Sequence, residues 1–250
     1  MKTKILLLIA ITTLALSSLA CGVTINGPDF DFNVIEGSGN LVSEERSVSD
    51  FNAVTLAGMG TLIIEYGDEE ALTIEAEDNL IEHIETEVRG DTLVIGIEDG
   101  YTFNTNATLR YYLTVDDLEA VKVSGLGDVE LDPTETESFT VEISGAGDID
   151  IDSLDADNLD VSLSGLGNLK INGGEVVSQE INISGTGDYN GLDLQSTQTR
   201  VDVSGLGSAT VNVSESLDVN ISGAGHVKYT GNPSIDQSVS GVGSLEYIGE

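Results

Sequence analysis

Seven short repeats in the second half of the chain each place one polar residue directly after a Gly-x-Gly segment. The residues at this position are Asp128, Asp148, Asn168, Asp188, Ser208, His226 and Ser244. If the repeats stack, these side chains form a ladder, and Gly- and Asp-rich β-rolls bind Ca²⁺ through such ladders. Those β-rolls use a nine-residue repeat, whereas Asp, Asn and Ser also accept backbone N–H bonds at turns. We favour the turn role and predict no metal ligand, with a calcium site as the alternative.

Catalytic chemistry has little support in the residue pattern. The two histidines, His83 and His226, lie in no motif with a Ser or Cys nucleophile. The Gly-x-Gly segments precede neither a helical pattern nor a Lys-Ser/Thr pair, so they are not phosphate loops. Enzymes that cleave acidic polysaccharides need basic residues, and the few in the repeats occupy no fixed position: Lys122, Lys170, Arg200 and Lys228. We therefore expect no enzyme activity, no catalytic residues and no cofactor.

Cys21 is the only cysteine, and it follows a segment that resembles a bacterial lipoprotein signal. Lys2 and Lys4 precede an apolar stretch over residues 5–16, and small residues lead to Cys21. Such signals are cut before the cysteine, whose thiol is diacylglycerated. Ser18 and Leu19 stand in the reverse of the usual order, which leaves an ordinary secretory signal as the alternative. The sequence predicts a signal peptide over residues 1–20 and a lipid anchor at Cys21, outside the cytoplasm in the cell envelope.

The net charge restricts the partners of the chain. It carries 44 acidic and nine basic residues, for a formal charge of −35, and loss of the two signal-peptide lysines takes this to −37. Nucleic acid is excluded as a partner because phosphate binding needs a basic surface. Anionic membranes would be repelled as well. Adaptation to high salt explains the acidity as well as any ligand does.

The spacing of the repeats predicts the fold. Their serines are 20 residues apart four times and then 18 apart twice: Ser124, Ser144, Ser164, Ser184, Ser204, Ser222 and Ser240. In each copy, apolar residues alternate with polar ones on both sides of the Ser-Gly-x-Gly corner, as two short strands with one buried face would. The pattern predicts an all-β fold, a right-handed parallel β-helix with about 18–20 residues per coil. A left-handed β-helix would show a hexapeptide subperiod, which this sequence lacks. A β-propeller is not favoured either, because its blades need about 40 residues, twice the period of this chain.

The corner residues have expected roles of their own. The two glycines must turn the chain sharply, and we expect positive φ angles there. The residue between them is mostly apolar, so we expect it to point inward: Leu126, Ala146, Leu166, Thr186, Leu206, Ala224 and Val242.

The chain divides into three parts by pattern. Residues 21–40 are rich in Gly, Pro and Asn and are predicted to form a tether. Residues 41–250 form one domain, less regular over 41–112 and built from regular coils over 113–250. Only residues 78–87 have a helical pattern, short enough to be a turn.

The less regular part carries a family resemblance. Its motifs are Phe51-Asn52-Ala53-Val54, Gly58-Met59-Gly60, Ile74 to Leu80 and Val88 to Leu93, followed by the Ser-Gly-x-Gly coils. In this order they resemble the head GIN domain of auto-transporter adhesins. The resemblance implies a β-helical adhesin of the cell envelope, without a known active site, that binds a surface glycan or protein. A calcium-dependent or carbohydrate-binding module is the alternative function, and a polysaccharide-active enzyme the third. No translocator barrel follows the last repeat, so self-export is not expected.

Overall fold

The computed structural model describes residues 33–249. The predicted signal peptide, Cys21 and the first part of the predicted tether lie outside the described residues. The chain separates into two units, Met1–Asn33 and Val34–Glu250. The second unit is an all-β stack of coils, which confirms the predicted parallel β-helix. The described residues contain no helix long and apolar enough to span a membrane.

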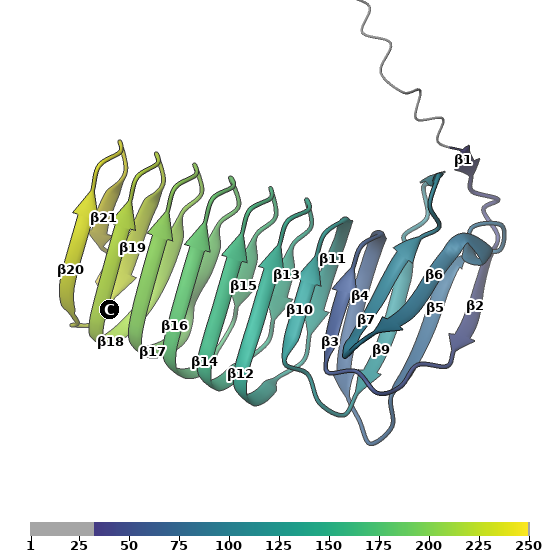
Figure 1. The fold of residues 1–250 in the computed structure, drawn as a ribbon, viewed down its shortest axis with the longest axis horizontal. Coiled ribbons are helices and arrows are strands. Elements are labelled where there is room, and N and C mark those ends of the chain that lie inside the picture. Colours follow the sequence, from purple (N-terminus) through teal and green to yellow (C-terminus); the bar gives the residue numbers. More distant parts are fainter. Residues whose placement is uncertain (1–32, 250) are drawn as a thin grey trace, which may run out of the picture. The chain divides into compact units, whose positions relative to one another are not determined.

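One side of the stack is a parallel sheet of long strands (Figure 1). Its strands are β10 (Ala120–Val123), β12 (Thr134–Ile143), β14 (Leu154–Leu163), β16 (Gly174–Ile183), β17 (Tyr189–Val203), β18 (Ala209–Ile221) and β20 (Ser234–Val239). Each strand pairs with its equivalent one repeat later, as Val141 does with Val161 and Val201 with Val219. The register therefore reproduces the sequence periods of 20 and 18.

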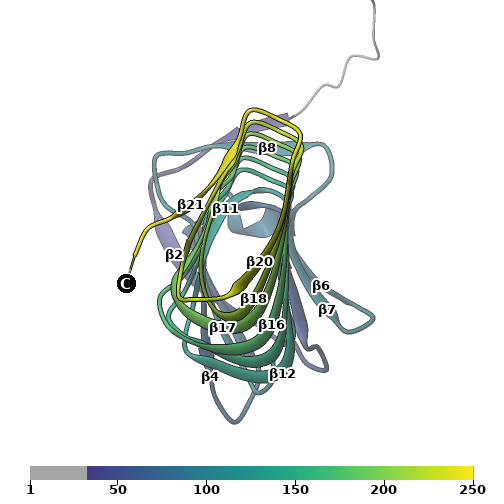
Figure 2. The same ribbon diagram turned by 90° about the vertical axis from the view of Figure 1, so that its left-hand side faces the viewer.

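The opposite side is formed by shorter strands, and the coil is flattened between the two (Figure 2). These strands are β11 (Leu126–Leu131), β13 (Ile149–Ile151), β15 (Leu169–Ile171), the first parts of β17 and β18, β19 (His226–Thr230) and β21 (Ser244–Tyr247). The Ser-Gly-x-Gly corners join the two sides along the upper edge in Figure 1, and a second row of corners, beginning at residues 132–138, follows the lower edge. Each coil thus has two corners that repeat in register.

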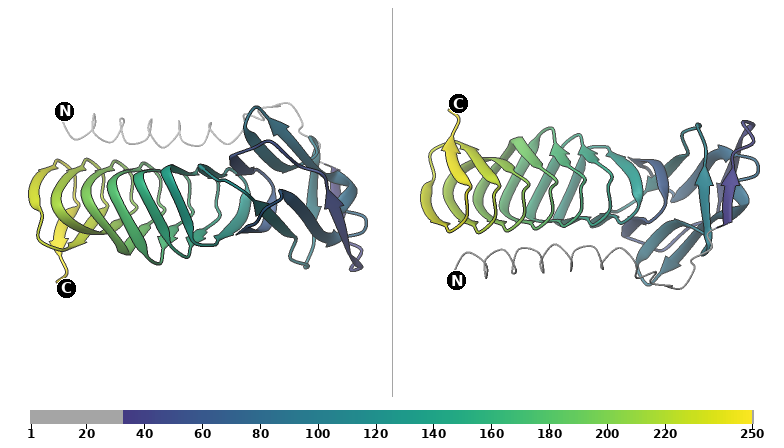
Figure 3. Two further views of the ribbon diagram at one scale, coloured as in Figure 1. Left: turned by 90° about the horizontal axis from the view of Figure 1, so that it is seen from below. Right: turned by 90° about the horizontal axis from the view of Figure 1, so that it is seen from above.

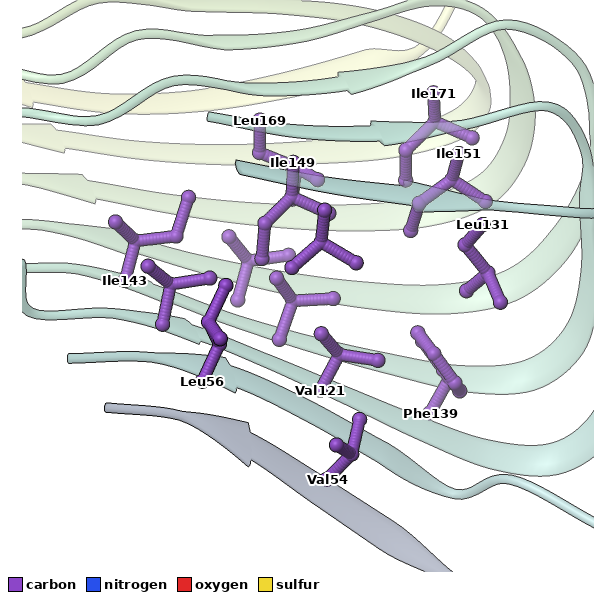
Figure 4. Close-up of a cluster of buried hydrophobic side chains, with 14 of the residues drawn as sticks. Val54, Leu56, Val121, Leu131, Phe139, Ile143, Ile149, Ile151, Leu169 and Ile171 are labelled. Carbon is purple, nitrogen blue, oxygen red and sulfur yellow. The ribbon is translucent and has the colours of Figure 1, made fainter. Parts of the chain in front are cut away.

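The core lies between the two sheets and consists of ladders of apolar side chains (Figure 4). Ile149 stacks on Leu169 and Ile151 on Ile171, and all four are fully buried. The period-2 alternation of the sequence places these residues inward and their charged neighbours, Asp150 and Lys170, outward. Burial of this alternating apolar set is the main stabilising term of the stack.

One ladder of buried apolar residues, which includes Phe139 and Leu159, continues into polar side chains. Gln179 lies in register with Leu159, and its amide oxygen accepts a hydrogen bond of 2.8 Å from the Tyr189 hydroxyl. The Gln179 amide nitrogen donates to Thr199 at 3.0 Å. Gly191 leaves the space that the Tyr189 ring occupies, since a Cβ there would lie 2.4 Å from the hydroxyl oxygen. Burial raises the pKa of Tyr189 above its ordinary value, so the hydroxyl stays protonated and keeps its bond.

The first coils in space do not follow chain order. β3 (Ala53–Leu56) lies between β7 (Thr92–Ile97) and β10, parallel to both. β4 (Met59–Tyr66) likewise lies between β9 (Arg110–Val115) and β11. The coil of residues 92–115 is therefore outermost, and the coil of residues 53–66 is held inside it. In chain order the inner coil of residues 53–66 comes first, the outermost coil of residues 92–115 follows, and the chain then returns to the inner side of the stack at β10 (Figure 3).

Antiparallel strands cover this N-terminal end of the stack. β6 (Ile84–Arg89) pairs with β7, β5 (Ala71–Glu77) pairs with β9, and β2 (Leu41–Arg46) pairs with β5. A single 3-10 turn, η1 (Ile81–His83), is what remains of the helical pattern expected over residues 78–87. At the other end of the stack, every residue of β20 is exposed.

The described part of the predicted tether joins the folded unit. β1 (Asn33–Glu36) pairs with β8 (Tyr101–Asn104). The Asn40 amide then donates to the Asp78 carboxylate at 2.8 Å. Residues 33–40 are therefore held against the N-terminal coils, so the tether prediction over 21–40 extends too far toward the domain.

The corner glycines have a different role from the one expected. Positive φ angles occur elsewhere, for example at Gly60 and Gly174, but at none of the Ser-Gly-x-Gly glycines of the described coils. A Cβ at Gly165 would instead lie 1.9 Å from the Gly145 carbonyl oxygen of the preceding coil. The glycines are required because successive backbones touch at the corner, not because the turn needs left-handed geometry.

We predict that Gly165→Ala destabilises the protein by about 1–3 kcal/mol, because a methyl group there displaces the backbone of the neighbouring coil. Gly173→Ala is the matched control, since its Cβ would meet no atom closer than 3.7 Å. That variant should be neutral or slightly stabilising. The measurement is urea unfolding of both variants. Equal stability of the two would contradict the close-approach explanation.

Candidate functional site

The polar residues after the corners form a hydrogen-bonded ladder that runs along the stack. The Asp128 carboxylate accepts the backbone N–H of Asp148 at 2.9 Å, and Asp148 accepts that of Asn168 at 2.7 Å. Asn168 accepts the N–H of Asp188 at 3.0 Å, and Asp188 accepts that of Ser208 at 2.7 Å. Each side chain therefore satisfies an amide of the next coil, which is the turn role that the sequence favoured.

This ladder gives the carboxylates a structural task. One oxygen of each is directed to a backbone amide, and the Asn168 side-chain amide also donates to Asp148 at 2.9 Å. Over residues 33–249, no group of three or more His, Cys, Asp or Glu side chains has a metal-binding arrangement. The hydrogen bonds of the ladder connect each of these coils to the next.

The two histidines have separate surroundings. His226 Nδ1 lies 2.9 Å from Ser244 Oγ of the next coil, so the structure pairs a histidine with a serine that sequence reasoning kept apart. Among the described side chains no carboxylate bonds this imidazole, and a triad needs that third group. His83 stacks on Tyr101 at 4.3 Å between ring centroids and contacts Glu98 Oε2 at 2.7 Å. His226 therefore connects two successive coils, whereas His83 contacts residues of the N-terminal end of the stack.

The residues between the corner glycines point outward, and the sequence expectation that they point inward is wrong. Leu126, Leu166 and Leu206 are 69%, 67% and 65% exposed, and Val242 is 81% exposed. The neighbouring glycines place the backbones of successive coils in contact, which leaves no interior space at the corner. The residues Leu126, Ala146, Leu166, Thr186, Leu206, Ala224 and Val242 thus form a line on the surface, here called the corner ridge.

A groove follows the corners of the other edge. Its walls are two rows of residues that repeat every 20 positions and are all exposed except Thr197, and its floor is a row of smaller or more buried residues. The first wall contains Glu135, Asp155, Glu175 and Gln195, the second Glu137, Asp157, Val177 and Thr197, and the floor Thr136, Ala156, Val176 and Ser196. The groove has a volume of about 840 Å³ and is open to solvent.

Charge in the groove is negative at one end and neutral at the other. Five carboxylates lie over its first coils, whereas Gln195 and Thr197 close the far end. None of the described residues that line it is basic. Arg200 lies outside the groove and pairs with Asp202 at 2.8 Å, and this hydrogen bond raises the pKa of its guanidinium. The groove therefore suits a ligand with positive charge more than an anion.

Sequence reasoning missed the groove, although its signal is in the repeats. The residue types of the acidic segments between the coils differ from one repeat to the next. Aligned by the 20-residue period, however, Glu135, Asp155 and Glu175 occupy one position and Glu137 and Asp157 another. What the sequence could not show is that these two rows stand on either side of a bend within one strand.

The fold and its two edge surfaces define a β-solenoid whose exposed rows repeat from coil to coil. The chain belongs to the family described as "Putative auto-transporter adhesin, head GIN domain", whose model matches residues 50–233. Membership confirms the resemblance seen in the sequence and implies a location at the cell surface or otherwise outside the cytoplasm. No curated protein matches the chain.

Solved structures share the fold over most of the chain. A "putative adhesin" from Bacteroides fragilis NCTC 9343 is 26% identical, with a TM-score of 0.81, and the match covers 86% of this chain and 100% of that one. A "putative adhesin" from Parabacteroides distasonis ATCC 8503 is 23% identical, with a TM-score of 0.66 and the same coverage. A "putative lipid binding protein" from that organism is 19% identical, with a TM-score of 0.63, and the match covers 86% of this chain and 100% of that one. The last two matches are evidence of the fold alone.

We predict that Asp148→Asn leaves the melting temperature unchanged or slightly raised, because an amide oxygen still accepts the Asn168 N–H and one negative charge is removed. Asn168 already performs this task for Asp188. Asp148→Ala removes the acceptor and should lower the melting temperature by about 2–4 °C. Thermal unfolding of the three proteins measures the difference.

Ca²⁺ and Mg²⁺ at matched ionic strength should raise the melting temperatures of all three proteins similarly, by screening. A rise with Ca²⁺ alone that Asp148→Asn abolishes would assign the ladder a metal instead.

Proposed function

We propose that the chain is a lipid-anchored, extracytoplasmic adhesin of the cell envelope that binds a surface glycan or protein without turnover. The observation that carries this proposal is the open groove with its repeated carboxylates. Family membership supports an adhesive role, and the named adhesin structures support the same fold. The acidic surface argues against nucleic acid as a partner.

The groove is the proposed ligand-binding surface because its shape and chemistry repeat along the stack. A ligand lying along it would meet equivalent positions about every 4.8 Å, the spacing of paired strands. Such a surface favours an elongated partner, either an amine-bearing glycan or a basic segment of a protein. Its affinity would come from several weak ion pairs, each of which is modest at an exposed site. Binding through this groove should therefore decrease as salt concentration rises.

The experiment is a binding screen of the chain against glycans and matrix proteins, followed by variants that remove charge and preserve shape. The triple variant Glu135→Gln, Asp155→Asn, Glu175→Gln should weaken binding about tenfold or more, since each ion pair contributes a fraction of a kcal/mol and the three act together. The matched control is Glu130→Gln with Asp150→Asn, two exposed carboxylates on the opposite sheet. If a ligand binds the groove variant as tightly as it binds the unchanged protein, the binding site lies elsewhere. If the screen finds no ligand, the proposed adhesive role is wrong.

The anchor is tested separately. We predict that Cys21→Ser moves the protein from the membrane fraction to the soluble extracytoplasmic fraction, because the thiol that carries the lipid is absent. The measurement is fractionation of cells that express either form. A serine variant that stays in the membrane fraction would refute lipid anchoring and favour the ordinary secretory signal with another means of attachment.

A further inference from the structure

The corner ridge is a surface whose side chains alternate in size. Along the stack the order is Leu126, Ala146, Leu166, Thr186, Leu206, Ala224 and Val242, so a large apolar residue alternates with a small one. The large residues are among the most exposed apolar side chains of the described chain. An exposed apolar row of this regularity is unusual on an otherwise acidic surface, and it points to an interaction.

The backbone holds this ridge at fixed intervals. The N–H of each ridge residue donates to a corner glycine carbonyl of the preceding coil, as Leu166 does to Gly145 at 3.0 Å and Thr186 to Gly165 at 3.1 Å. Successive ridge residues are therefore about 4.8 Å apart, and successive large residues about 10 Å apart. Each small residue leaves a gap of about one side chain between two large ones. The ridge is a rigid row of knobs and gaps.

We infer that the ridge binds the ridge of a second copy of this chain, running antiparallel and displaced so that knobs enter gaps. In this register Leu126 faces Ala224 of the second copy, Leu206 faces Ala146, and Leu166 faces Thr186. Every large residue of these six coils then meets a small one. Val242 faces Met59, a partly buried residue of the preceding N-terminal coil, which extends the apolar contact. The arrangement is a closed two-fold dimer.

The polar ladder beside the ridge fits the same pairing. A two-fold axis perpendicular to the stack brings the ladders of both copies to one side of the interface. Asp128 then faces His226 of the second copy, Asp148 faces Ser208, and Asn168 faces Asp188. No two carboxylates meet, because the acidic members occupy the early coils and the Ser and His members the late ones. The order of charges along the ladder is therefore complementary to its own reverse.

Other pairings of two ridges fit less well. A parallel dimer with its axis along the stack places each residue opposite itself, so leucines collide and alanines leave voids. An antiparallel register displaced by one coil in either direction brings large residues against large ones, and it brings Asp188 against its own copy or against Asp148. Of these three arrangements, the size order and the charge order favour the same one.

The first test is sedimentation velocity of the full chain carrying Cys21→Ser, over a range of protein concentration. We expect a reversible dimer that strengthens with salt, because the net charge of −35 opposes association at low ionic strength. Leu166→Ser with Leu206→Ser should weaken dimerisation about tenfold or more, through loss of buried apolar area. Val177→Ser, at a residue 52% exposed in the groove, is the matched control and should dimerise normally. A monomer at every concentration and salt, or a dimer unaffected by the ridge variant, would overturn the inference.

The second test fixes the register by disulfide formation. In the Cys21→Ser background, Leu126→Cys and Ala224→Cys are prepared as separate proteins. The inferred dimer places these two positions opposite each other, whereas like positions lie five coils apart, about 24 Å. Oxidation should therefore cross-link the mixture and neither protein alone. Cross-linking within either single variant would indicate a parallel dimer and contradict the proposed arrangement, as would a dimer that cross-links in no combination.

Discussion

The close contact between successive backbones at the Ser-Gly-x-Gly corner is the constraint on which the other features depend. Gly165 and Gly167 lie so near the carbonyl oxygens of the preceding coil that no side chain fits between them. The contact forces the two sheets to meet in a tight bend, and it aligns each coil with the next. It also fixes the register of every ladder, because a shift by one residue would bring a Cβ into the contact.

Both edge surfaces follow from this constraint. At the corner itself, the absence of interior space turns the middle residue outward and produces the corner ridge. The amides exposed by the bend need acceptors, and the side chains of the following position supply them from the neighbouring coil. At the other edge, the same register lines up carboxylates such as Glu135 and Asp155. Equivalent residues of successive repeats therefore lie in continuous rows on both edges of the stack.

Much of the fold could be predicted from the sequence, because period and alternation are both backbone properties. The 20-residue and 18-residue spacings appear unchanged as strand register, and alternating residues such as Val141 and Ile143 are buried as expected. The direction of Leu166 could not be predicted, since an apolar residue between glycines suggests burial unless the approach of the next coil is known. The order of β3, β7 and β10 was also inaccessible, because the repeat signal is weak before residue 113 and strand pairing over such distances leaves no periodic trace.

The displaced order of the first coils restricts how the length of this protein can change. From β12 onward each coil contacts only its neighbours in sequence, so one whole coil can be inserted or deleted while the others keep their partners. Residues 53–115 do not allow this, because the inner coil is held by segments that come later in the chain. An odd number of added coils would place two leucines or two small residues side by side on the ridge. Variation that preserves the alternation must therefore proceed in pairs of coils.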